Sequence, residues 1–181
     1  TRDVHSVPTP RLGGVAMFCG VLAGVVCAYN TPFLQDLFQQ PDPVIGILGA
    51  GTILCLLGVI DDIWDINWVA KLAGQTLAAG FMALKGVALL SIPFDTVIIG
   101  SQRLSLILTV LVVLVTINAV NFVDGLDGLA AGVVTIGGVA FFVYTYQLAI
   151  DTSPTSYANL ASLITSLLVG ACLGFLPHNF N

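Results

Sequence analysis

The chain has 181 residues, of which 57% are hydrophobic and 8% charged, and its mean hydropathy is +1.00. Soluble domains usually carry about a quarter charged residues, so this composition excludes an ordinary soluble domain and indicates a lipid bilayer as the protein's surroundings. The net charge of −5 comes from ten acidic residues, all Asp, against five Lys plus Arg, too few basic residues for a nucleic-acid-binding surface.

The inventory of possible metal and thiol ligands excludes two familiar metal motifs. Without Glu the chain cannot hold an H-E-x-x-H protease site or a complete EF-hand loop. His5 and His178 are too far apart in sequence to suggest a local zinc site. The cysteines lie in apolar runs with no C-x-x-C pair, and we interpret them as small buried hydrophobic residues.

Six apolar segments follow one another along the chain, each near the length of about 17 to 25 residues that a helix needs to cross a bilayer. They are too long and uninterrupted to be the strands of a membrane barrel. The sequence therefore predicts an all-α, polytopic transmembrane helical bundle that forms one domain over residues 1–181. The six predicted spans cover residues 12–29, 44–60, 69–90, 104–118, 129–150 and 158–176.

Six spans place the connecting segments alternately on two sides of the membrane. The side that we call the active face contains nearly every residue able to do chemistry; it receives segments 1–11, 61–68, 119–128 and 177–181. The other side receives turn-rich connectors at 30–43, 91–103 and 151–157. Arg2, Arg11 and Lys71 lie on or next to the active face and Arg103 on the other, so the positive-inside rule predicts that the active face is cytoplasmic.

The first polar motif on this face is HSVPTPRLGG, at residues 5–14. Two prolines stiffen the segment, and Gly13 and Gly14 would let another backbone approach closely. His5 and Arg11 would then be presented at the membrane surface. On these residues alone, a stiff loop without catalytic function is an equal alternative.

The second motif is the adjacent pair Asp61 and Asp62, followed by Lys71. Neighbouring side chains on a helix do not face each other, so the two carboxylates are expected to have different partners. Lys71 could reach a phosphate group. For Asp65, and for Trp64 and Trp68 as interfacial anchors, a solvated turn is the preferred interpretation.

The third motif spaces two amides and two carboxylates three residues apart: Asn118, Asn121, Asp124 and Asp127. The glycines at 125 and 128 permit an irregular backbone, so the four side chains can converge on a small volume. Hard oxygen ligands of this kind suit Mg²⁺, or they can hydrogen-bond a nucleobase or ribose. In the alternative interpretation, Asp127 caps the next helix, Asp124 forms a turn and the asparagines bond neighbouring helices.

Together the three motifs resemble the polyprenyl-phosphate N-acetylhexosamine-1-phosphate transferases, a family of the glycosyltransferase 4 type. The resemblance includes an H-x-x-P-x-P-R-x-G-G loop, a D-D pair followed by Lys, and N-x-x-N-x-x-D-G-x-D-G-L, and it extends over the whole chain. The loop resembles the branch that uses UDP-GlcNAc. The matching residues are His5, Pro8, Pro10, Arg11, Gly13, Gly14, Asp61, Asp62, Lys71, Asn118, Asn121, Asp124, Gly125, Asp127, Gly128 and Leu129, with Asn179 beginning an N-x-x-P-A element.

The resemblance implies Mg²⁺-dependent transfer of GlcNAc-1-phosphate from UDP-GlcNAc to polyprenyl phosphate, with release of UMP, as the first membrane step of a cell-envelope glycan pathway. Mn²⁺ is an alternative ion. The implied catalytic residues are Asp61, Asp62, Asp124 and Asp127, the last two as metal ligands. The implied substrate-binding residues are His5, Arg11, Lys71, Asn118, Asn121 and Asn179.

The resemblance also implies a multi-pass protein of the plasma membrane, and a homodimer is compatible with it. A family member would have a helix before Thr1 and further segments after Asn181, including another Asp implicated in Mg²⁺ binding. We therefore expect the chain to be a fragment lacking both ends, and we do not expect activity from the fragment alone.

Three alternative functions remain at this stage. The first is the phospho-MurNAc-pentapeptide transfer of peptidoglycan synthesis, which differs only in the sugar. The second is a transporter, which would place ionisable groups near the bilayer midplane, whereas Lys85 lies near a span end and can snorkel to the surface. The third is a non-catalytic scaffold, for which Gly20 and Gly24 would provide a packing face, but this leaves the third motif unexplained.

Overall fold

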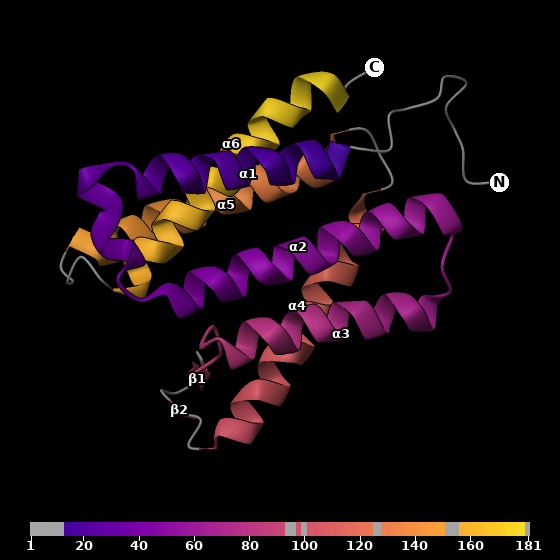
Figure 1. Cartoon of the computed structure of the whole chain (residues 1–181), viewed down its shortest axis with the longest axis horizontal. Coiled ribbons are helices and arrows are strands. Elements are labelled where there is room, and N and C mark those ends of the chain that lie inside the picture. Colours follow the sequence, from indigo (N-terminus) through magenta and orange to yellow (C-terminus); the bar gives the residue numbers. More distant parts are fainter. Residues whose placement is uncertain (1–12, 93–96, 99–100, 125–127, 151–155, 180–181) are drawn as a thin grey trace.

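The computed structural model describes residues 13–92, 97–98, 101–124, 128–150 and 156–179, and within them the protein is a bundle of α-helices (Figure 1). This confirms the predicted all-α, polytopic class. A 3₁₀ helix η1 (Pro32–Phe38) follows the first helix, and short antiparallel strands β1 (Ser91–Ile92) and β2 (Val97–Ile98) pair Ser91 with Ile98. The helices are α1 (Gly13–Tyr29), α2 (Pro41–Trp64), α3 (Trp68–Leu84), α4 (Gln102–Val123), α5 (Leu129–Ile150) and α6 (Tyr157–Asn179).

Local sequence explains several helix ends. Proline at the first position of η1 and of α2 supplies a backbone dihedral that suits a helix start and lacks only an N–H that would have no helical partner. Asp65 ends α2 in the left-handed conformation, with φ 46°, and Asn67 then caps α3. Gly86, with φ 91°, lies two residues after the last residue of α3. The turn between α2 and α3 is therefore short and well defined.

In the described part of the chain, fewer helices than the six predicted are long and apolar enough to span a membrane. Among the described residues, α2, α4, α5 and α6 are long and apolar enough to cross a membrane, and a fifth span is reached only if α1 and η1, which are bent by 108°, count as one. Helices α1 and α3 have 17 residues each, about 26 Å at 1.5 Å per residue, which is less than the hydrocarbon thickness of about 30 Å. The segment predicted at 69–90 is cut short because the chain leaves the helix at Gly86.

Three helices are longer than predicted on the active face. Helix α6 continues to Asn179, although a connector was predicted from residue 177. Helix α2 continues to Trp64, so Asp61 and Asp62 lie in its last turn and not in a connector. Helix α4 continues beyond the predicted end at Asn118 to Val123, so that Asn121 is also helical. Hydropathy marks where the lipid-facing stretch ends, whereas a helix ends where its backbone hydrogen bonding is interrupted, and none of these polar residues interrupts it.

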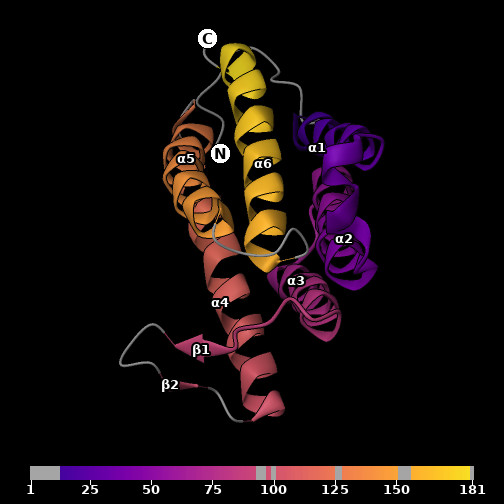
Figure 2. The same ribbon diagram turned by 90° about the vertical axis from the view of Figure 1, so that its left-hand side faces the viewer.

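The helices pack through small residues. Helices α2 and α3 form an antiparallel pair, α4 crosses α3, and Figure 2 shows α6 lying between α5 and the side formed by α1 and α2. The best buried residues include Ala78 and Ala79 of α3. At Gly49 of α2 a Cβ atom would lie 2.4 Å from a ring carbon of Phe81 on α3, so only glycine permits this approach. Such close contacts are typical of helix packing in lipid.

The chain order brings the predicted active face together at one end of the bundle. The N-terminal ends of α1 and α3 and the C-terminal ends of α2 and α6 all lie on the right-hand side of Figure 1. The opposite ends of α1, α2 and α3 lie on the left. The candidate site is therefore built from helix ends that meet at one surface.

Candidate active site

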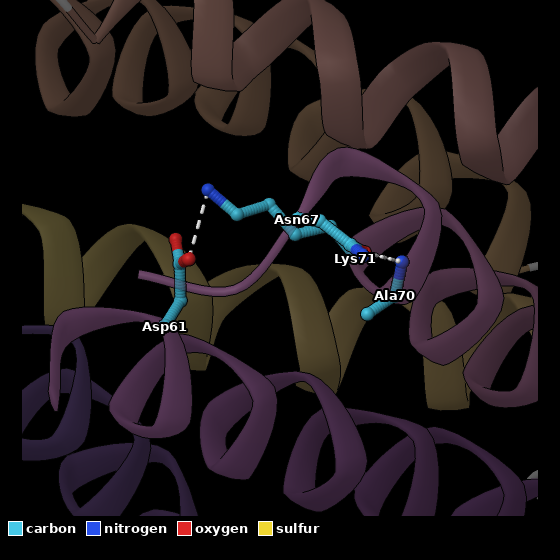
Figure 3. A network of polar contacts seen from close by, with 4 residues as sticks. All are labelled: Asp61, Asn67, Ala70 and Lys71. Carbon is cyan, nitrogen blue, oxygen red and sulfur yellow. Dashed lines mark hydrogen bonds and ion pairs between the residues drawn. The ribbon is translucent and has the colours of Figure 1, made fainter. Parts of the chain in front are cut away.

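The turn between α2 and α3 holds an ion pair that belongs to the second sequence motif. Nζ of Lys71 lies 2.8 Å from Oδ1 of Asp61, an oxygen that is itself buried (Figure 3). The side chains of Lys71 and Asp61 are 37% and 30% exposed, so solvent screens the pair and its contribution to stability is small, about 0–1 kcal/mol. The main effect of the ion pair is on geometry, because Asp61 determines the position of the ammonium group of Lys71.

Asn67 sets the start of the helix that presents Lys71. Its Oδ1 accepts a hydrogen bond from the backbone N–H of Ala70, at 2.8 Å (Figure 3). Lys71 is thereby held in the first turn of α3, where the positive end of the helix dipole adds to its own charge. This end of α3 favours an anion such as a phosphate.

Asp62 has different surroundings from Asp61, as the sequence predicted. It lines a cleft of about 500 Å³ that is also lined by Asp124, at the C-terminal end of α4. The rest of the cleft wall comes from α1 and α2 and is glycine or apolar: Gly14, Val15, Phe18, Gly51, Leu54, Cys55, Gly58 and Val59. Two motifs 62 residues apart in the chain thus contribute carboxylates to one cleft whose remaining wall suits an apolar group.

Both carboxylates of this cleft lie at the C-terminal ends of helices. Asp62 lies in the last turn of α2 and Asp124 follows the last residue of α4, where its N–H donates to the carbonyl oxygen of Val120 at 3.0 Å. The partial negative charge of a helix C-terminus disfavours a carboxylate in each case. A bound cation would offset both charges.

The donor chemistry fits Mg²⁺ as a partner of these carboxylates. The described residues contain no group of three or more His, Cys or Asp that could hold a metal ion on its own. Asp62 and Asp124 would thus supply two oxygen ligands, and Mg²⁺ usually takes the remaining positions from water and substrate phosphates.

Asn118 contacts a neighbouring helix. Its Nδ2 donates to Oε1 of Gln75 on α3 at 2.9 Å and to the carbonyl oxygen of Leu114 at 2.8 Å. This geometry matches the alternative interpretation in which the asparagines bond neighbouring helices. Gln75 was missed from the sequence, although a signal was present: it is a polar residue inside an apolar span, four residues after Lys71 and therefore on the same helix face.

The remaining predicted site residues fall into two groups. Asn121 is exposed on α4 and Asn179 is half-buried at the end of α6, and neither lines the cleft of Asp62 and Asp124. His5, Arg11 and Asp127 lie outside the described residues. Their predicted roles stay predictions.

Comparison with known proteins gives consistent matches. The family model described as "Glycosyl transferase family 4" matches residues 44–181. The chain is 42% identical to the decaprenyl-phosphate N-acetylglucosaminephosphotransferase of Mycobacterium leprae and 41% identical to that of Mycobacterium tuberculosis, over 99% of this chain and 46% of each relative. It is 31% identical to a probable undecaprenyl-phosphate N-acetylglucosaminyl 1-phosphate transferase of Bacillus subtilis, again over 99% of this chain and 46% of the relative.

The chain therefore spans about half the length of the curated relatives it matches. No solved structure gives a significant match.

Proposed function

The chain belongs to glycosyl transferase family 4, and from this premise we propose that the protein transfers GlcNAc-1-phosphate from UDP-GlcNAc to a polyprenyl phosphate. The observation that carries the proposal is the cleft that Asp62 and Asp124 line together, and the ion pair between Lys71 and Asp61, the neighbour of Asp62 in sequence, supports it. The relatives' names, which specify a polyprenyl-phosphate acceptor and N-acetylglucosamine, support the choice of substrates. Because the chain spans about half of each relative, the activity is proposed for the whole protein.

The proposed reaction is a phosphoryl transfer at the membrane surface. An oxygen of the lipid phosphate attacks the phosphorus that carries the sugar, the bond from this phosphorus to the oxygen bridging to UMP breaks, and UMP leaves with that oxygen. Such reactions depend mainly on positioning the groups and on neutralising their negative charge. A cleft with two carboxylates would by itself repel two anionic substrates, so the proposal requires a divalent cation.

We assign the cation to Asp62 and Asp124, with Asp127 as a predicted further ligand. The ion is Mg²⁺ in this proposal, with Mn²⁺ as the alternative, and when bound it neutralises the diphosphate of the nucleotide sugar. Lys71, oriented by Asp61, binds a phosphate oxygen. His5 and Arg11 are proposed to contact phosphates too, and Asn121 and Asn179 to bind the uridine or sugar.

The aspartates are assigned to positioning and not to proton abstraction. A phosphate monoester has a second pKa of about 6, so at neutral pH the attacking lipid phosphate is already mostly ionised. We therefore expect Asp61→Asn and Asp62→Asn enzymes to lose rate at every pH. A pH–rate profile in which either variant loses only an acidic limb and recovers at high pH would instead assign that residue as a base.

The proposal also places the site at the cytoplasmic surface of the plasma membrane. Trp64 and Trp68 flank the turn beside the ion pair and are 69% and 75% exposed, as expected for aromatic residues at a membrane–water interface. A nucleotide sugar from the cytosol would meet a lipid phosphate at such a surface, and the positive-inside rule supports the same side.

An assay of the full-length protein with radiolabelled UDP-GlcNAc, polyprenyl phosphate and Mg²⁺ tests the function. We expect labelled lipid and UMP in equal amounts, and loss of both on chelation of the metal. The absence of Mg²⁺-dependent labelled lipid would refute the enzyme and leave the transporter and scaffold alternatives. Replacing the donor with UDP-MurNAc-pentapeptide or UDP-GalNAc tests the sugar, for which the relatives' names favour GlcNAc.

A further inference from the structure

A hydrogen bond between two amide side chains joins α3 to α4 next to the candidate active site. Gln75 is 9% exposed, and its Oε1 accepts from Nδ2 of Asn118 at 2.9 Å. The second hydrogen of this Nδ2 goes to the carbonyl oxygen of Leu114, at 2.8 Å. Both donor positions of the exposed residue Asn118 therefore bond protein oxygens, and Asn118 does not line the cleft of Asp62 and Asp124.

Gln75 and Asn118 lie on α3 and α4 close in sequence to the predicted site residues Lys71 and Asp124. Gln75 lies one helical turn after Lys71, on the same face of α3. Asn118 lies on α4, six residues before Asp124. The bond thus links the helix that presents Lys71 to the helix that ends just before Asp124, and it restrains how far this end of α4 is displaced and rotated relative to α3.

In the described part of the chain, no residue in the half of α4 near the site is fully buried. The buried residues of α4 are Ser105 and Thr109, and both serve the opposite end of the helix. There the hydroxyl of Ser105 donates to the carbonyl oxygen of Leu89, at 2.5 Å. The hydroxyl of Thr109 accepts from the backbone N–H of Leu89, at 2.9 Å. Near the site Phe122 is 88% exposed, whereas Leu114 and Ile117 are half-buried. Val120 and Val123 line a small cavity together with residues of α5.

We propose that Gln75 is a positioning residue of the transferase, an inference that rests on the function proposed above. Through Asn118 it holds the active-face end of α4, and so it determines where Asp124 stands relative to Asp62 and Lys71. Asn118, for which the sequence predicted substrate binding, acts in the same pair. Neither residue touches substrate in this assignment; both act through Asp124.

Activity measurements on the full-length protein test this role. We expect Gln75→Leu and Asn118→Leu each to lower kcat about tenfold to 100-fold, the range for displacing a reacting group by about 1 Å, and to raise the Mg²⁺ concentration needed for half-maximal rate. The double variant should be no worse than either single one, because both remove the same bond. Gln75→Glu keeps an acceptor oxygen and should retain most of the activity.

Thr76→Val is the matched control. Thr76 is the exposed neighbour of Gln75 on α3, and its hydroxyl donates within its own helix, to the carbonyl oxygen of Leu72 at 2.7 Å. This variant should keep wild-type kcat and Mg²⁺ dependence. Full activity of Gln75→Leu, or losses that multiply in the double variant, would refute the positioning role.

A distance measurement separates this inference from the proposed function. Spin labels at Leu77→Cys and Val115→Cys, in full-length protein whose native cysteines are replaced by alanine, would report the α3–α4 distance; both sites are exposed. We expect one narrow distance that broadens with Gln75→Leu and Asn118→Leu and is unchanged with Thr76→Val. An unchanged distance in both leucine variants refutes the inference, whether or not the wild type proves to be a transferase, whereas an inactive wild type refutes only the function.

Discussion

Replacing Lys71 by Met should separate the catalytic use of its ion pair from its contribution to stability. The pair joins Nζ of Lys71 to Oδ1 of Asp61 at 2.8 Å with both side chains about one-third exposed, so its loss should cost about 0–1 kcal/mol of unfolding free energy. If the ammonium group also holds a substrate phosphate in the transition state, a charged hydrogen bond of about 1.5–3 kcal/mol is lost with it. That corresponds to a fall in kcat/KM of about 10- to 150-fold.

The chain offers a matched control for this prediction. Nζ of Lys85 lies 2.8 Å from Oδ1 of Asp42, with the lysine 36% exposed, but this pair joins α2 and α3 at their opposite ends. Lys85→Met should therefore change the stability by a similar small amount and leave kcat/KM at the wild-type value. Thermal unfolding in detergent and initial rates with the full-length protein measure the two effects side by side.

Asp61 should act only through Lys71. Asp61→Asn is expected to lower kcat/KM less than Lys71→Met, and the double variant should be no slower than Lys71→Met alone. Wild-type kcat/KM in Lys71→Met, or equal losses in Lys71→Met and Lys85→Met, would refute the assignment of Lys71 to a phosphate. The ion pair would then be a structural contact between two helices.

Three further predictions concern the cleft and the helix contacts. Asp62→Asn and Asp124→Asn should each raise the Mg²⁺ concentration needed for half-maximal rate, because each removes a charged ligand from one cleft. A metal titration of the rate measures this. An unchanged titration curve would show that the residue is not a ligand of the ion. Gly49→Ala should destabilise by about 1–3 kcal/mol because its Cβ would lie 2.4 Å from an aromatic ring carbon, whereas Gly20→Ala, with nothing within 4 Å, should not lower the thermal midpoint. Asn67→Ala should cost about 1 kcal/mol through loss of the α3 cap, measured by denaturant or thermal unfolding; equal stability would show that the cap contributes nothing.

Helix ends mark the limit of what could be predicted from residue patterns. The apolar runs indicated where the chain meets lipid, but α2 and α4 extend through polar residues to Trp64 and Val123. Conversely, an apolar stretch continues past Gly86, where the third helix has already ended. Hydropathy indicates which residues face lipid or water. The residue at which a helix ends depends instead on capping side chains and on glycine, which interrupt the backbone hydrogen bonding.

The sequence by itself determined the class of protein and the place where chemistry can occur. An apolar composition with long uninterrupted segments leaves helices as the available way to satisfy backbone hydrogen bonds in lipid, and alternation of the spans then groups the polar motifs on one face. Residue spacing also indicated that Asp61 and Asp62 would have different surroundings.

Only the tertiary structure showed which polar side chains of the motifs contact one another. It paired Lys71 with Asp61, placed Asp62 and Asp124 in the wall of one cleft, and joined Asn118 to Gln75. The physical reason is that lipid is as apolar as the side chains facing it, so hydrophobic pattern does not specify how one membrane helix is rotated against the next. Close packing of small residues and a few polar contacts set that rotation, and with it the geometry of the site.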